Sequence, residues 1–256
     1  MKLIKVAAAV LNQTPLDWAG NQARIRGALA QAREQGASVV CLPELCLTGY
    51  GCEDAFHAPG VARKAWQVLH ELEPETRGLV VTLGLPVWHL KSLYNMIALV
   101  VDGRIAGFAA KRHLAGDGIH YEPRWFKAWP EGVTALLTDD EGRAYMAGDL
   151  VFDAGGVRFG FEICEDAWSA DRPGVSLCRR GVDVILNPSA SHFAFGKNAV
   201  RQRFILEGSR AFHAAYVYAN LLGNESGRAI FDGEAMIACG GRLVATAERF
   251  SYQDFS

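Results

Sequence analysis

The chain has 256 residues, of which half are apolar and 21% are charged, so we expect one compact domain with a large core. A formal net charge of -2 gives no electrostatic reason to expect a nucleic acid or an anionic membrane as a partner. No segment approaches the roughly 20 apolar residues of a membrane span, and the apolar run at 6–11 is shorter than a secretory signal core.

The cysteines show neither a zinc-binding nor a redox pattern, because no two of them have the C-x-x-C spacing. They are Cys41, Cys46, Cys52, Cys164, Cys178 and Cys239. Without a secretion signal, we expect free thiols in a reducing cytoplasm rather than disulfides.

Short β-rich runs alternate with helical stretches along the chain. In chain order, single strands are predicted at 4–11, 38–42, 79–85, 182–189 and 216–222. Amphipathic helices are predicted between them at 21–35, 60–72 and 200–214. Strand–helix–strand order of this kind is typical of parallel pairing in an α/β fold.

Glycine-containing pairs add antiparallel hairpins to this pattern. Two hairpins are predicted at 95–111 and 151–164, with turns at Asp102-Gly103 and Gly155-Gly156, and two further hairpin turns at Asp232-Gly233 and Gly240-Gly241. A polar and aromatic loop at 112–130 separates the first two. The sequence therefore predicts an α/β fold with mixed sheets.

Three reactive side chains stand at the carboxyl ends of predicted strands. Glu44 follows the strand at 38–42, and Lys111 and Cys164 end the two hairpins. Ligands gather at this edge of α/β sheets, so a carboxylate, an ammonium and a thiol could meet there. Each also has an ordinary structural explanation, as a solvated loop charge or a core thiol, and spacing alone does not decide between the two.

The surroundings of Cys164 raise a chemical question. Glu165 and Asp166 follow it directly, and carboxylates raise a thiol's pKa and weaken it as a nucleophile. An active Cys164 would need a base and a positive charge from elsewhere in the chain.

Four stretches carry a family resemblance: LPELCLTGYGCEDAF (42–56), KRHLAGDGIHYEPRWF (111–126), FGFEICEDAW (159–168) and NPSASHFAFGKNAVRQRF (187–204). They resemble the nitrilase superfamily of carbon–nitrogen hydrolases, and more narrowly the glutaminase domain of glutamine-dependent NAD synthetases. The resemblance implies a four-layer αββα sandwich and a catalytic triad of Glu44, Lys111 and Cys164. It also implies an active site that needs no metal and no cofactor.

The same resemblance suggests supporting residues. It places Glu122 beside the catalytic lysine and Tyr50 in the wall of the pocket. It implies that the polar end of glutamine would be bound by Glu165, Ser189, Ser191 and Lys197. Lys197 stands where some relatives carry arginine, and a lysine binds a carboxylate as a single point charge rather than as a fork. His113 and His120 lie near Lys111 in sequence but lack a metal-ligand spacing, so we expect them at the surface.

The leading hypothesis is a thiol amidase that hydrolyses L-glutamine to glutamate and ammonia through a Cys164 thioester. Three alternatives remain open: an amidase for another small amide, a weakly supported cysteine protease, and a non-catalytic interaction subunit. The Ser-Gly-Gly-x-Asp-Ser loop of an ATP-dependent synthetase domain does not occur in the sequence. We therefore expect a single glutaminase-type domain, either free-standing or part of a longer enzyme, with an ammonia-using NAD synthetase as possible partner. The resemblance also implies a homo-oligomer.

Overall fold

The computed structural model describes residues 4–225 and 227–256 and contains two large mixed β-sheets. One sheet has the strand order β1-β2-β3-β4-β5-β7-β6: β1 (Val6–Ala8), β2 (Val39–Cys41), β3 (Val80–His89), β4 (Ser92–Val101), β5 (Arg104–Ala110), β7 (Ala144–Gly148) and β6 (Thr134–Thr138). The other has the order β15-β14-β11-β10-β9-β8: β15 (Arg242–Thr246), β14 (Ala235–Cys239), β11 (Ala215–Asn220), β10 (Val184–Ser189), β9 (Val157–Phe161) and β8 (Phe152–Ala154).

Helices and short elements connect and cover these sheets. The α-helices are α1 (Trp18–Glu34), α2 (Pro59–Leu72), α3 (Glu122–Trp125), α4 (Gly174–Arg179) and α5 (Lys197–Ala211). The 3₁₀-helices are η1 (Glu53–His57), η2 (Glu73–Thr76) and η3 (Cys164–Trp168), and β12 (Leu222–Asn224) pairs with β13 (Ile230–Asp232).

The two sheets pack face to face through an apolar layer. Ile97 and Leu99 of β4 belong to the same buried cluster as Phe161 of β9 and Leu186 of β10. Strands buried on both faces read as continuous apolar runs, which explains the apolar stretches at 96–101 of β4 and 184–186 of β10. This layer holds the ends of strands from both sheets in fixed relative positions.

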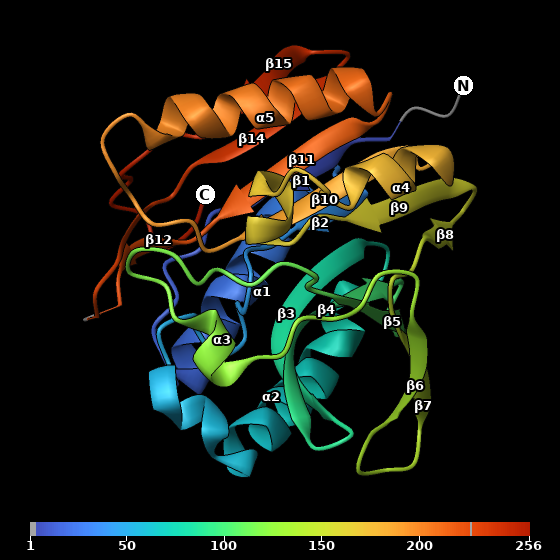
Figure 1. Ribbon diagram of the computed structural model, residues 1–256, viewed down its shortest axis with the longest axis vertical. Helices are drawn as coiled ribbons and strands as arrows, with labels where there is room; N and C mark the ends of the chain where they lie inside the picture. Colours follow the sequence, from blue (N-terminus) through green and yellow to red (C-terminus); the bar gives the residue numbers. More distant parts are fainter. Residues whose placement is uncertain (1–3, 226) are drawn as a thin grey trace.

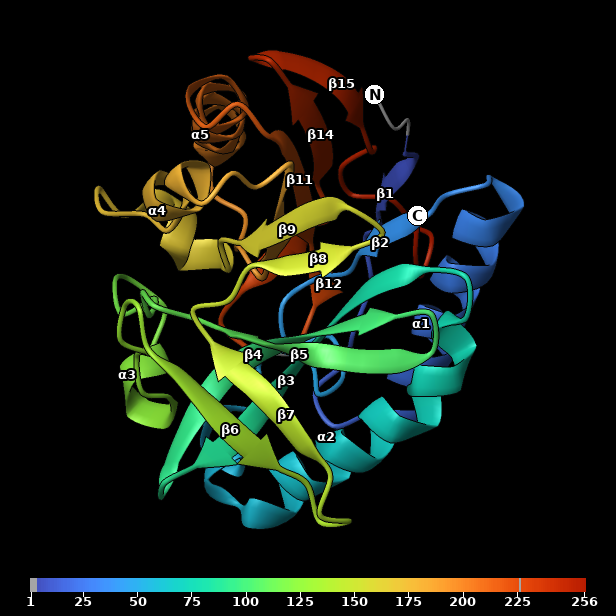
Figure 2. The ribbon, with the colours of Figure 1, turned by 90° about the vertical axis from the view of Figure 1, so that its right-hand side faces the viewer.

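Helices cover the outer face of each sheet. Leu29 of α1 and Leu69 of α2 pack in one cluster with strands of the first sheet, and Ile205 of α5 packs with Tyr216 of the second. Figure 2 shows α4 and α5 on one side of the paired sheets and α1 and α2 on the other. The four-layer αββα sandwich with mixed sheets is thus confirmed (Figure 1).

Most predicted elements are present, with shifted ends. The hairpins at Asp102-Gly103 and Gly155-Gly156 are confirmed, and all four turn residues have positive φ, which glycine and aspartate tolerate best. The Gly240-Gly241 hairpin is also confirmed, between β14 and β15.

Other expectations need correction. Asp232-Gly233 is not a hairpin turn, because β13 pairs with β12 whereas β14 pairs with β11 and β15. The predicted strand at 4–11 forms a ladder only over β1, and the first helix begins at Trp18, where Asp17 caps it by accepting a hydrogen bond from Gly20 N. Strands β6 and β7 and helices α3 and α4 were not predicted from the sequence.

Within 4–225 and 227–256, no helix combines the length and the apolar character needed to cross a membrane.

Candidate active site

Three neighbouring loops place Glu44, Lys111 and Cys164 at the carboxyl ends of β2, β5 and β9. Glu44 lies in the turn after β2, where Leu47 N donates to Gly84 O of β3 (3.1 Å). Lys111 stays in register with β4 because its backbone N donates to Asn95 O (3.0 Å). Strand pairing in the first sheet therefore places Glu44 and Lys111, and packing of the second sheet against the first brings Cys164 to them.

The Lys111 ammonium bridges two buried carboxylates. Its Nζ lies 2.6 Å from Glu44 Oε1 and 2.7 Å from Glu122 Oε1, and all three side chains are 0% exposed. Burial by itself would lower the pKa of Lys111, but the Glu122 and Glu44 charges outweigh it and hold this pKa well above its usual value. Lys111 therefore carries a permanent positive charge inside the site.

The surroundings of Glu44 raise its affinity for a proton. Burial raises the pKa of Glu44 and the Glu122 charge adds to this, while the Lys111 ammonium opposes both. Asn95 Nδ2 donates to Glu44 Oε1 (2.7 Å), and Ala190 N donates to Oε2 (3.1 Å). These donors orient the carboxylate but leave it able to take up a proton, as a group that alternates between base and acid requires.

Cys164 begins η3 with a positive φ of 48°. A left-handed conformation is strained for a residue with a Cβ, and such residues concentrate at functional sites. Burial raises the pKa of the Cys164 thiol, and the Glu44 charge raises it further against the Lys111 charge. The thiol is therefore protonated at neutral pH and needs a base when it attacks.

Asp166 supports this turn and was missed as a functional residue. Its Oδ2 accepts from Ile163 N (2.9 Å), and its Oδ1 accepts from Arg112 N (3.0 Å) and His113 N (2.7 Å). One buried carboxylate thus ties the residue before Cys164 to the residues after Lys111. The signal was present in the sequence, since an acid in the first turn of a helix commonly caps backbone N–H groups.

Glu122 has its own set of partners. Tyr50 Oη donates to Glu122 Oε1 (2.7 Å), and Ala115 N donates to Oε2 (3.0 Å). The structure therefore brings Tyr50, Glu122, Lys111 and Glu44 into one hydrogen-bonded array.

The residues predicted to bind substrate divide into two groups. Glu165 and Lys197 are half-buried, and Lys197 interacts electrostatically with both Cys164 and Glu165. Ser189 and Ser191 make contacts elsewhere: Ser189 Oγ donates to Asn187 Oδ1 (2.5 Å), and Ser191 Oγ accepts from Arg201 Nε (3.2 Å). Ala190, which lies between these serines, is the residue that contacts Glu44.

Arg201 holds the end of the Ser189–Ser191 segment in place. Nothing in the sequence indicated this role. Arg201 is fully buried, and its Nη2 donates to Ser191 O and to His192 O (both 2.8 Å). Asp232 balances the buried charge through Arg201 Nη1 (2.7 Å).

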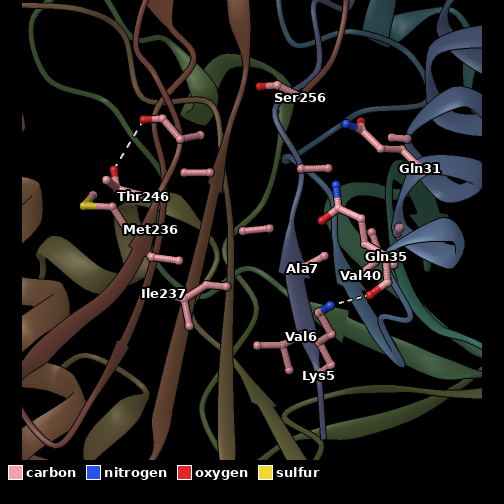
Figure 3. A pocket seen from close by; sticks show the side chains of 17 residues that line it. Lys5, Val6, Ala7, Gln31, Gln35, Val40, Met236, Ile237, Thr246 and Ser256 are labelled. Carbon is pink, nitrogen blue, oxygen red and sulfur yellow. Dashed lines mark hydrogen bonds between the residues drawn. The ribbon is translucent and has the colours of Figure 1, made fainter.

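Two cavities differ in their relation to Glu44, Lys111 and Cys164. A cavity of about 340 Å³ lies between β1 with α1 and β14 with β15, and none of the triad residues line it (Figure 3). A smaller cavity of about 40 Å³ reaches the array at Tyr50, and His120, Trp125 and Glu225 also line it.

Within the described ranges, no group of three or more His, Cys, Asp or Glu side chains is arranged to hold a metal ion.

A buried thiol facing a carboxylate and an ammonium, inside an αββα sandwich, is the arrangement of a thiol-dependent hydrolase. The sequence profile of the carbon–nitrogen hydrolase family matches residues 5–253. The chain therefore belongs to the carbon–nitrogen hydrolase family, and the resemblance to the nitrilase superfamily is confirmed.

The chain is similar to two glutamine-dependent NAD(+) synthetases in sequence, and it shares its fold with an amidase. The glutamine-dependent NAD(+) synthetase of Saccharomyces cerevisiae is 34% identical over 262 residues, covering 98% of this chain and 37% of that protein. The crystal structure of a glutamine-dependent NAD(+) synthetase from Cytophaga hutchinsonii is 42% identical with a TM-score of 0.93, covering 100% of this chain and 42% of that one. An amidase from Nesterenkonia sp. shares the fold, with 20% identity, a TM-score of 0.73 and coverage of 96% and 86%. The chain thus spans less than half the length of the two synthetases.

Proposed function

We propose that this chain hydrolyses the side-chain amide of L-glutamine to glutamate and ammonia. The observation that carries the proposal is the buried Glu44–Lys111–Glu122 array with Lys111 Nζ at 2.6 and 2.7 Å from the two carboxylates, beside a thiol on a strained turn. The similarity to glutamine-dependent NAD synthetases supports glutamine as the substrate.

The first half-reaction forms a thioester. Glu44 accepts the Cys164 proton as sulfur attacks the amide carbon, and the carbonyl oxygen becomes an oxyanion. Lys111 Nζ and the Glu165 backbone N–H stabilise that oxyanion. Glu44 then passes the proton to the amide nitrogen, the carbon–nitrogen bond breaks, and ammonia leaves.

The second half-reaction returns the free thiol. Glu44 removes a proton from a water molecule whose oxygen attacks the thioester carbon, and Lys111 again stabilises the oxyanion. The carbon–sulfur bond breaks, the Cys164 sulfur takes the proton from Glu44, and glutamate is released. Glu44 acts in turn as base and acid, which its raised pKa suits.

The charged end of glutamine is assigned to residues beside Cys164. Glu165 pairs with the α-ammonium and Lys197 with the α-carboxylate, while Tyr50 lines the pocket. From the segment that Arg201 anchors, Ser191 contributes its hydroxyl proton to this polar end, and Ser189 contributes only after its hydroxyl leaves Asn187. The position of Lys197 near both Cys164 and Glu165 supports this assignment.

The ammonia is proposed to supply NAD synthesis. The proposed partner is an ammonia-using NAD synthetase, as a separate protein or as a further domain of a longer chain. We also infer a cytoplasmic setting, which the six free cysteines support, and a homo-oligomer. Exposed apolar side chains on adjacent elements, Val200 of α5 with Leu243 and Val244 of β15, support the oligomer.

Ammonia release from L-glutamine and from a panel of small amides and nitriles tests the proposal. We expect release from glutamine, and a loss of at least about a thousandfold in Cys164→Ala, because no other group can form the thioester. A variant retaining a tenth of the activity would exclude the covalent route, and faster release from another amide would exclude glutamine as the preferred substrate. Inactivity on every compound, also after addition of an ammonia-using NAD synthetase, would favour a non-catalytic subunit.

A further inference from the structure

Two histidines form a direct hydrogen bond beside the catalytic array. His120 Nε2 lies 2.7 Å from His192 Nδ1, with ring centroids 4.7 Å apart. His120 is half-buried rather than at the surface as expected from the sequence, and it lies on the loop between β5 and α3. His192 follows β10 and is held by Arg201 through its backbone O (2.8 Å).

Each histidine of this pair also contacts a further polar side chain. His120 Nδ1 lies 3.2 Å from Tyr50 Oη, whose hydroxyl also reaches Glu122. Lys197 Nζ lies 3.0 Å from His192 Nδ1 and 3.4 Å from His192 Nε2. The chain of contacts therefore runs without a break from Lys197 to the carboxylate that holds Lys111.

Ammonium groups at or beside both ends of the path act electrostatically on Cys164. The charges of Lys111 and Lys197 each interact with the Cys164 sulfur. Burial lowers the pKa of His120 to about 3 and that of His192 to about 4, with the nearby Lys197 charge adding to both shifts. The two imidazoles are therefore neutral near pH 7, and each has one donor and one acceptor nitrogen.

The donor and acceptor nitrogens of the two imidazoles permit two sets of hydrogen-bond directions along the path. When His192 Nδ1 is unprotonated, its single lone pair is shared by the Lys197 ammonium and the His120 Nε2–H, and the Tyr50 hydroxyl is shared between His120 Nδ1 and Glu122 Oε1. When His192 Nδ1 carries the proton, it donates to His120 Nε2, and His120 Nδ1 donates to Tyr50. The Tyr50 proton is then directed to Glu122.

We propose that His120 and His192 are positioning residues that couple binding of an anionic substrate group at Lys197 to the hydrogen bonding of Glu122. The inference rests on the proposed function, in which that group is the α-carboxylate of glutamine. An anion that draws the Lys197 ammonium away from His192 Nδ1 allows this nitrogen to carry the proton. Tyr50 then donates to Glu122 alone, which strengthens the hydrogen bond that already holds Glu122 beside Lys111.

A double-mutant cycle on L-glutamine hydrolysis tests the coupling. His192→Phe and His120→Phe keep an aromatic ring but remove both nitrogens, and Lys197→Met removes the ammonium while keeping the stem. We expect kcat/KM to fall about tenfold or more in each single variant, as for the loss of a hydrogen bond in a charged network. Combining His192→Phe with Lys197→Met should add less than about a further twofold, because both act on one path. His89→Phe, whose ring packs against Tyr94 and Trp129, is the control with unchanged activity.

The outcomes separate this inference from the proposed function. Losses that multiply in the double variant would show that Lys197 and His192 act independently and would overturn the coupling alone. A wild-type protein that does not hydrolyse glutamine would overturn the proposed function and the coupling with it. As a second readout, imidazole ¹⁵N spectra of Cys164→Ser should show His192 Nδ1 gaining a proton when glutamine binds, and an unchanged tautomer with bound glutamine would also overturn the coupling.

Discussion

Lys111 lies between Glu44 and Glu122, and this group of three charges determines the acid–base behaviour of the site. With all three ionised, the buried array carries an excess negative charge, which is costly in a medium of low polarity. Part of that cost is relieved when Glu44 takes up a proton, and its pKa is raised accordingly. In the proposed mechanism, the Cys164 proton therefore has an acceptor whose affinity for it is higher than that of an ordinary carboxylate.

Glu122→Gln tests this account through the pH dependence of kcat/KM. The Glu122 charge raises the pKa of Glu44, so its removal should lower that pKa and move the acidic limb of the profile to lower pH. The plateau should fall about ten- to a hundredfold, because Lys111 loses one of its two carboxylate partners. A profile from pH 4 to 9 on glutamine gives both quantities. An acidic limb that stays in place, or moves to higher pH, would show that Glu122 does not set the affinity of the base.

At the scale of elements, close approach between a strand and a turn sets the position of Glu44. β3 passes directly beneath the turn that carries Glu44, and this contact requires a glycine. A Cβ on Gly84 would lie 2.4 Å from the backbone N of Leu45, the residue that follows Glu44. Glycine inside a strand commonly marks a point where another backbone approaches closely.

Gly84→Ala should therefore affect stability and activity together. We expect a loss of about 1–3 kcal/mol in the free energy of unfolding, since either β3 or the Glu44 turn must shift. The value of kcat should also fall, because the turn carries the base. Gly60→Ala is the matched control: this glycine in α2 has open space around its Cβ position, so its substitution should be neutral or stabilising by up to about 1 kcal/mol. Urea unfolding of both variants measures this difference in stability. Equal unfolding midpoints for the two variants would contradict the close contact at Gly84.

At the scale of the whole molecule, the sandwich joins two sheets whose strand ends each contribute part of the site. Glu44 and Lys111 come from the first sheet and Cys164 from the second, and the apolar layer between the sheets fixes their separation. At the outer edge of the second sheet, unlike in the layer between the sheets, every residue of β15 is exposed. An exposed edge strand with apolar side chains is a surface that proteins generally cover.

Sedimentation at micromolar concentration tests the proposed homo-oligomer. We expect a dimer or larger assembly, and Val244→Lys should shift the distribution toward the monomer, because a charge on β15 would have to be buried in the contact. The far-UV circular dichroism of the variant should match that of the wild type. A wild-type protein that sediments as a monomer would exclude the oligomer.

Local and periodic features were sufficient to predict much of this molecule. The apolar runs of β4 and β10 and the turn residues Asp102-Gly103 and Gly155-Gly156 have a local physical cause, so the alternation of strands and helices followed from the sequence. The family and the candidate triad of Glu44, Lys111 and Cys164 were predicted from the resemblance to the nitrilase superfamily, because spacing alone did not decide between a catalytic and a structural role.

Only the tertiary structure decided how polar groups distant in sequence meet. Asn95 reads as one polar residue in an apolar strand, yet it orients Glu44. Asp166 reads as a repulsive neighbour of Cys164, yet its carboxylate is bound by backbone N–H groups from two segments. His120 and His192 are 72 residues apart and share a hydrogen bond. Sequence patterns report which residues are buried, whereas hydrogen-bond partners depend on how the layers pack, and that information exists only once the chain has folded.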